Sequence, residues 1–184
     1  MAQSKGIVLV TFKHFVHKRF GEAGWNTLLE ALSAADQTEL KLAVTIGWYD
    51  FFLRVRAVST MDRVLGQGDG QLIRDWGHFG AESDLTTVQR AFLRLANPAY
   101  LIEKAGTYWR RFYDWGEWTV IRDNPCAATG TLAGSPVRDE IYCTELTAYL
   151  ARMLELAGAK GVEVQHPQCH GRGNPLCVFV ATWR

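Results

Sequence analysis

The spacing of apolar residues in this 184-residue chain changes close to Gly116. Upstream, apolar residues recur three or four positions apart, which is typical of helices that bury one face. Downstream, from Trp118, they alternate with polar residues, which is typical of half-buried strands. One later segment, 137–157, returns to the helical spacing. We therefore predict an α+β fold, in which a helical N-terminal portion packs on an antiparallel sheet of about four strands in β-β-α-β-β order.

The same spacing predicts the individual elements. In the N-terminal portion it indicates helices at 8–20 and 22–32, a break at 33–36, a short helix from there to 44, and a helix at 49–65. Residues 72–95 fit one long helix, or two helices with a bend at 77–80. Residues 6–10 also fit the opening of a strand. Asn97 and Pro98 fit a helix start, because Asn caps a helix and Pro suits its first position, and this helix is expected to run to about Asp114. Strands are predicted in a pair around 118–131, and at 162–168 and 178–183.

Charge and composition exclude several classes of protein. Lysine plus arginine total 20 and aspartate plus glutamate total 19, for a net charge of +1. A near-neutral chain is not expected to coat nucleic acid. No stretch approaches the roughly 20 apolar residues of a membrane-spanning helix, and the N-terminal apolar run is too short for a signal peptide. With only four cysteines, we expect a cytoplasmic protein without a membrane span rather than a disulfide scaffold.

Three cysteines and one histidine form the most informative set in the sequence: Cys143, His166, Cys169 and Cys177. His166 and Cys169 end one predicted strand, Cys177 begins the next, and Cys143 lies in the first turns of the helix before them. Thiolates with one imidazole favour zinc over magnesium or calcium, and four protein ligands leave no position for a catalytic water. We therefore predict a structural zinc ion as the cofactor. Alternatively, these cysteines are small buried hydrophobic residues, as we expect for Cys126.

An aromatic-rich stretch at 108–115 supplies the candidate ligand-binding residues Trp109, Phe112 and Tyr113. Aromatic side chains commonly line cavities that hold small apolar molecules. The alternative interpretation is an ordinary core helix with a solvated face at Arg110 and Arg111.

The remaining side chains give little sign of catalysis. His14 and His17 lie three positions apart and are interpreted as surface residues rather than metal ligands. His78 is the one mid-helix candidate for a haem ligand, but we attribute Gly77 and Gly80 beside it to close helix packing. No Ser-His-Asp or Cys-His nucleophile pattern and no Gly-x-Ser-x-Gly motif occurs, so no catalytic residue is assigned and no enzyme activity is predicted.

The C-terminal segment LELAGAKGVEVQHPQCHGRGNPLCVFV resembles the 4-vinyl-reductase-type ligand-binding domain, a family related to the haem-NO-binding-associated superfamily and to transport-particle subunits. Phenol-responsive sensors of that family use three cysteines, and Cys143, Cys169 and Cys177 match them in order and spacing. His166 stands where the family has a carboxylate. The segments MDRVLGQGDGQLIRDWGHFGAESDL and NPAYLIEKAGTYWRRFYDWG resemble a stand-alone bacterial version of this module.

The resemblance implies a pocket for a small hydrophobic ligand and a homodimer. The phenol sensors hold their ligand with a His and a Trp that have no counterparts here, so a different ligand is expected. The predicted function is a non-enzymatic small-molecule-binding or sensory domain stabilised by zinc. The alternatives are a ligand-free structural dimer resembling transport-particle subunits and an accessory protein of tetrapyrrole vinyl reduction. We expect one domain, 1–184, with a dimerising helical arm at 1–45 and a strand-rich zinc-binding module at 116–184.

Overall fold

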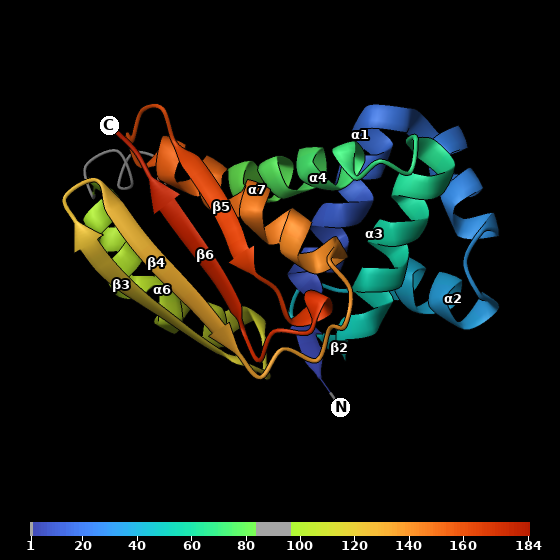
Figure 1. Cartoon of the computed structure of the whole chain (residues 1–184). Coiled ribbons are helices and arrows are strands. Elements are labelled where there is room, and N and C mark those ends of the chain that lie inside the picture. Colours follow the sequence, from blue (N-terminus) through green and yellow to red (C-terminus); the bar gives the residue numbers. More distant parts are fainter. Residues whose placement is uncertain (1, 84–96) are drawn as a thin grey trace.

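The computed structural model describes residues 2–83 and 97–184 and confirms the predicted α+β fold (Figure 1). The described helices are α1 (Gly6–Glu30), α2 (Ala34–Leu42), α3 (Phe51–Leu65), α4 (Gln71–Ser83), α6 (Asn97–Phe112) and α7 (Ile141–Leu156). The strands are β1 (Gln3–Lys5), β2 (Trp48–Asp50), β3 (Glu117–Asn124), β4 (Ala127–Ala133), β5 (Glu163–Gln168) and β6 (Cys177–Thr182). A 3-10 turn (His170–Arg172) joins β5 to β6.

Two antiparallel sheets form, of which one was predicted. The four-stranded sheet has the order β3-β4-β6-β5, so both predicted hairpins form and β4 pairs with β6 between them. A second, two-stranded sheet pairs β1 with β2, with Ser4 opposite Tyr49. The predicted strand option at 6–10 is wrong, because these residues belong to α1 and only the three residues before them are extended.

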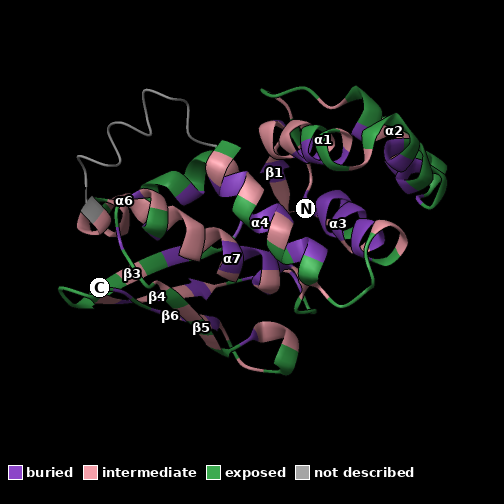
Figure 2. Ribbon diagram, turned by 90° about the horizontal axis from the view of Figure 1, so that it is seen from above, coloured by how far each residue is buried: buried purple, intermediate pink, exposed green. Residues whose placement is uncertain are grey.

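The N-terminal helices share one hydrophobic core. α1 is kinked at Gly21, whose φ of 65° is open to glycine but strained for other residues, and this non-helical residue separates the two helices predicted on either side of it. α2 begins after Ser33, whose hydroxyl accepts a hydrogen bond from the backbone N–H of Asp36 at 3.1 Å. Figure 2 shows buried residues on the sides of α1, α3 and α4 that face one another. The core residues are Leu9, Phe12, Phe15, Val16, Trp25, Leu28, Leu29, Leu40, Leu53, Val58, Met61, Leu72, Ile73 and Trp76.

Several predicted boundaries shift by a few residues. α7 begins at Ile141 rather than at 137, because Val137 is buried in a loop in which its N–H donates to the Ser135 hydroxyl at 3.3 Å. α3 begins at Phe51, after Asp50, whose carboxylate accepts from the N–H of Phe52 at 3.2 Å. α4 is described to residue 83, and the predicted continuation to 95 lies outside the described residues.

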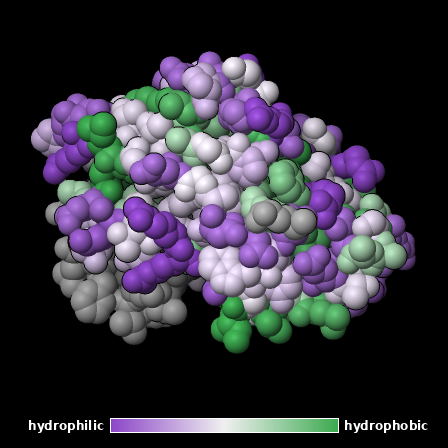
Figure 3. All heavy atoms as spheres, turned by 90° about the horizontal axis from the view of Figure 1, so that it is seen from below, coloured by the Kyte–Doolittle hydropathy of each residue, from purple (hydrophilic) through white to green (hydrophobic). Residues whose placement is uncertain are grey.

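The molecule has no described helix that is both long and apolar enough to cross a bilayer. Its face seen from below is mixed in hydropathy, with small groups of hydrophobic side chains along the edges (Figure 3).

α4 and α7 approach each other closely at Gly77, as predicted from the glycines of this segment. A Cβ atom at Gly77 would lie 2.5 Å from the carbonyl oxygen of Glu145 and 3.0 Å from the Cβ of Ala148. At Gly80 the nearest atom is 3.7 Å away, in the ring of Tyr149, which is an ordinary contact. Gly77 therefore sets the distance between the two helices, and Gly80 does not.

We expect Gly77→Ala to lower the free energy of unfolding by about 1–3 kcal/mol, because the added methyl group forces apart backbone that cannot yield locally. Gly80→Ala is the matched control, and it should leave stability unchanged or raise it by up to about 1 kcal/mol through helix propensity. Urea unfolding of both variants measures the difference. Equal stability of the two would contradict the close approach at Gly77.

Candidate functional site

A cavity of about 760 Å³ lies between the N-terminal helices and the four-stranded sheet. This volume is within the usual range of roughly 300–1,000 Å³ for small-molecule sites. Helices α1, α3, α4, α6 and α7 and the four strands of the larger sheet all contribute to its wall. The apolar lining includes Val8, Trp76, Leu101, Ile102, Ala105, Trp109, Phe112, Trp118, Val120, Leu146, Leu150, Met153, Leu154, Val164 and Phe179.

The three residues predicted to bind a ligand all lie on this wall: Trp109, Phe112 and Tyr113. The indole N–H of Trp109 donates to the backbone carbonyl of Trp115 at 2.9 Å, and the Trp109 ring stacks on Trp118 with centroids 5.7 Å apart. Trp109 is therefore a fixed, buried part of the wall, and the alternative of an ordinary core helix is partly realised as well. Ligand binding by these residues stays a prediction.

A buried ion pair forms the polar part of the wall. The guanidinium of Arg54 on α3 donates to the Glu145 carboxylate on α7 and to the Tyr113 hydroxyl, and it lies 5.2 Å from the ring centroid of Tyr142. Arg54 and Glu145 are 6% and 4% exposed, so neither charge is solvated by bulk water. Because each charge balances the other, the interior of the cavity is electrically neutral overall.

The titration behaviour of these groups follows from burial and from each other. Burial opposes the charged form of Arg54, but the Glu145 carboxylate and the phenols of Tyr113 and Tyr142 outweigh it and raise the Arg54 pKa well above its ordinary value. Burial, aided by Tyr113, raises the pKa of Tyr142 well above that of a free phenol. The Tyr142 hydroxyl and the Trp76 indole N–H find no hydrogen-bond partner in the described part of the chain.

The mouth of the cavity lies along one face of α6. Tyr100, Tyr108 and Arg111 line the cavity and are exposed to solvent as well. Their spacing of eight and three residues places them on the same side of a helix. The Arg111 guanidinium lies 5.5 Å from the ring centroid of Tyr108. The rim is thus aromatic and carries a cation.

The predicted Cys/His set comes together at a second place, where α7 meets the end of the sheet. The ligand atoms of Cys143, His166, Cys169 and Cys177 all lie within 4.8 Å of one another, and the three cysteines are buried. The sulfur atoms of Cys143 and Cys177 are 3.5 Å apart. Below, these four residues are called the Cys/His cluster.

Local backbone structure holds the Cys/His cluster in place. The N–H of Cys169 donates to the Asn174 side chain at 3.0 Å, and the N–H of Asn174 donates back to the Cys169 carbonyl at 3.1 Å. The N–H of His170 donates to the Cys177 sulfur at 3.3 Å. The His166 ring stacks on Phe179 with centroids 4.4 Å apart, which fixes the orientation of the imidazole.

Two of the thiols share a proton. The hydrogen bond between them is the largest influence on both: it lowers the pKa of Cys177 to about 4 and raises that of Cys143 far above the ordinary value for a thiol. Burial adds to the rise at Cys143, and the His166 side chain helps to lower the pKa of Cys177. The lowered pKa of Cys177 favours its thiolate, which is the form in which cysteine binds metals.

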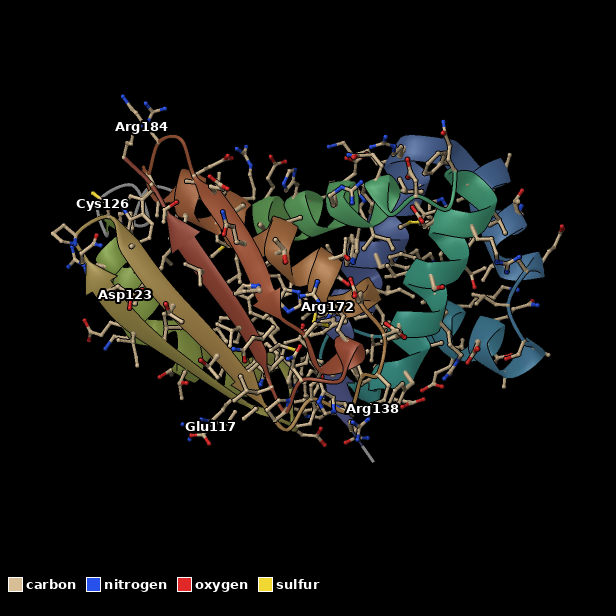
Figure 4. All side chains as sticks on the ribbon, viewed as in Figure 1. Glu117, Asp123, Cys126, Arg138, Arg172 and Arg184 are labelled. Carbon is tan, nitrogen blue, oxygen red and sulfur yellow. The ribbon has the colours of Figure 1, made fainter. Side chains whose placement is uncertain are left out.

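Other candidate residues lie away from both places. Cys126 is exposed at the β3–β4 turn (Figure 4), so its expected role in packing is wrong: the turn projects it into solvent. His14 and His78 are exposed, and His17 is half-buried against Trp25 with ring centroids 5.2 Å apart. None of these three histidines is among the residues that line the cavity.

Sequence reasoning missed the buried ion pair of Arg54 and Glu145. Arg54 lies in a helix whose spacing assigns it to a polar face, and Glu145 lies 91 positions away. A charged residue is rarely buried unless it is paired, and no local signal announces a partner so far away. The cavity, by contrast, was predicted, but only from the aromatic residues at 108–115 and from the family resemblance.

The sequence matches no known family model and no curated protein. Its fold matches solved structures of H-NOX proteins. One, from S. oneidensis in the Fe(II)NO ligation state, is 15% identical, with 98% of this chain and 99% of that chain covered and a TM-score of 0.75. Another, from K. algicida in the Fe(II) unliganded state, is 13% identical, with 98% and 96% covered and a TM-score of 0.68. At such identities the likeness shows the fold alone.

These comparisons correct the predicted cofactor. We expected zinc. The matching H-NOX structures are instead described in Fe(II) ligation states, and one of them concerns haem distortion in the H-NOX family. The prediction that zinc is the cofactor is therefore wrong, because the proteins that share this fold are described with Fe(II) and haem. The haem-NO-binding part of the expected resemblance agrees with these matches, whereas the 4-vinyl-reductase and transport-particle names stay predictions.

The cavity of this chain does not fit a haem held by an imidazole or a thiolate, which are common protein ligands of haem iron. Its lining residues include no histidine and no cysteine, and residues 84–96 contain neither in the sequence. Among the hydroxyls in the wall, burial keeps that of Tyr142 protonated, and that of Tyr113 accepts from Arg54. The fold is shared with the H-NOX structures, but neither an imidazole nor a thiolate is present among the residues that line this cavity.

Proposed function

We propose that this chain is a non-enzymatic sensory domain that binds a small, largely apolar molecule in the central cavity. The observation that carries the proposal is the cavity itself, about 760 Å³ in volume and lined chiefly by apolar and aromatic side chains. A ligand-free structural dimer would be expected to have a filled core behind the aromatic helix α6, and this cavity argues against it. Nothing in the cavity favours a role in tetrapyrrole reduction.

The position of the cavity suggests how binding would be sensed. Its wall combines α1, α3 and α4 from the N-terminal portion with α6, α7 and the sheet. A ligand that contacts both sides would favour the conformation in which they are closed around it, and a partner could read the resulting shift in population. The homodimer is part of this proposal. Support for it comes from two exposed apolar side chains: Leu42, within the predicted arm at 1–45, is 71% exposed, and Ile46, just after the arm, is 80% exposed.

Binding of N-phenyl-1-naphthylamine, a neutral apolar fluorophore, tests the proposal. We expect saturable binding by the wild-type chain and loss of binding in Ala105→Phe, because the new ring occupies space at the cavity wall. Thr107→Phe is the control, since Thr107 is an exposed residue of the same helix that does not line the cavity. Thermal melting confirms that both variants fold. Absence of saturable binding to the wild-type chain would contradict the proposed function.

Haemin provides a second arm of the same experiment. Without an imidazole or thiolate in the cavity, we expect added haemin to be removed by gel filtration. One haem retained per chain with a sharp Soret band would overturn the fit argument and make the chain a haem-dependent sensor.

We also infer that the Cys/His cluster binds a metal ion. Four ligand atoms within 4.8 Å of one another, three of them sulfur, support this inference. Such a site would join α7 to the β5–β6 loop, and its role would be structural because four protein ligands close the coordination sphere. Its largest expected consequence is described in the Discussion.

A further inference from the structure

The mouth of the cavity differs from its interior in charge. Inside, Arg54 is paired with Glu145, so a ligand group placed there meets no net charge. At the rim, Arg111 lines the cavity and is exposed, and no acidic side chain forms an ion pair with it among the described residues. An apolar cavity with one uncompensated cation at its mouth is complementary to an apolar molecule with one anionic end.

A second cation lies on the same face of α6. Lys104 is four residues before Tyr108 and four after Tyr100, and both of these tyrosines line the mouth. Among the described residues, the ammonium group of Lys104 pairs with its sequence neighbour Glu103, at 2.9 Å, in an exposed ion pair of small energetic value. The face of α6 that borders the mouth therefore carries Arg111 and, one helical turn before Tyr108, the Lys104 ammonium with its Glu103 partner.

The polar groups deeper in the wall do not favour a charged end inside. Burial of an unpaired carboxylate is costly, and Arg54, the interior cation among the described lining residues, already has a carboxylate partner. A ligand would thus enter with its apolar body first, against the rings of Trp109, Trp118 and Phe179, and leave its charged end at the surface.

From this arrangement we propose that the cavity takes an amphipathic monocarboxylate, whose apolar body fills the cavity and whose carboxylate lies beside Arg111 at the mouth. This inference rests on the proposed function and adds to it the chemical class of the ligand and its orientation. Arg111 is then a specificity-determining residue, since it selects an acid over an uncharged molecule of the same shape.

Decanoate and 1-decanol test the proposal, because they share an alkyl chain and differ in charge. Binding is measured by displacement of N-phenyl-1-naphthylamine at pH 8 and low salt. We expect the wild-type chain to prefer decanoate, and Arg111→Met to weaken decanoate binding about two- to fivefold without changing decanol binding, as for one exposed ion pair. High salt should reduce the preference of the wild-type chain.

Arg110→Met is the matched control, since Arg110 is an exposed neighbour that does not line this cavity. It should leave both affinities unchanged. If decanol binds as tightly as decanoate, or if the two arginine variants behave alike, the monocarboxylate proposal is wrong while the apolar-ligand function stands. If neither decanoate, decanol nor the fluorophore binds, the proposed function itself fails.

Discussion

Arg54→Met is expected to lower the free energy of unfolding by about 3–5 kcal/mol, the usual cost of removing one partner from a buried ion pair. The carboxylate of Glu145 would remain at 4% exposure without its guanidinium. The hydroxyl of Tyr113 would lose its donor as well. Since 1 kcal/mol shifts the melting temperature of a chain of this size by roughly 2–4 °C, a decrease of about 6–20 °C should be seen.

A double variant separates the ion pair from simple loss of packing. In Arg54→Met with Glu145→Leu, both charges are replaced by apolar groups, and most of the lost stability should return. Tyr113→Phe removes only the hydroxyl that accepts from Arg54 and should cost about 1 kcal/mol. If Arg54→Met alone were as stable as the wild-type chain in urea unfolding, the buried pair between α3 and α7 would be refuted.

Cys169→Ser is expected to abolish metal binding and to lower the melting temperature by about 10 °C. A metal ion that binds only the folded chain, at a free concentration 100- to 1,000-fold above its dissociation constant, contributes about 3–4 kcal/mol to stability. Cys169 is fully buried in the Cys/His cluster. A serine at this position removes one metal ligand and leaves the hydroxyl group buried. Elemental mass spectrometry of tag-free protein counts the metal, and thermal melting measures the stability.

The matched control is Cys126→Ser, because Cys126 is exposed and lies apart from the cluster. This variant should keep the metal and the melting temperature of the wild-type chain. A strong chelator should lower the melting temperature of the wild-type chain and of Cys126→Ser, but not of Cys169→Ser. Metal-free wild-type protein with four titratable thiols would show that Cys143, Cys169 and Cys177 are buried core residues and nothing more.

Local patterns predicted most elements but few of their contacts. The change of period at Gly116 separated the helices from the sheet correctly, because periodicity reflects which side of each element is buried. The strand pair β1–β2 escaped prediction, since each strand is only three residues long and gains its order from pairing with the other. The start of α7 was placed early because Val137 is buried in a loop, where burial does not imply helix.

The candidate sites differ in the same way. Cys143, His166, Cys169 and Cys177 could be grouped from the sequence, because a strand hairpin and the adjacent helix bring such spacings together predictably. The choice of cofactor could not be made from ligand chemistry, since the fold proved to be that of proteins described with Fe(II) and haem. Trp109, Phe112 and Tyr113 could be suggested as cavity lining, and a pocket was expected from the resemblance, but the elements that enclose it could not be predicted.

The sequence by itself determined the order of helices and strands, the placement of three cysteines and one histidine near a hairpin, and the absence of any histidine between residues 79 and 165. These properties depend on residue type and on spacing over a few turns. Only the tertiary structure decided that Arg54 meets Glu145, that a cavity remains behind α6, and that Arg111 at its mouth has no acidic partner among the residues that the structure describes. Such features arise where elements far apart in the chain pack together. Which charges pair and which volume stays unfilled depends on contacts between those elements, and local sequence patterns do not encode them.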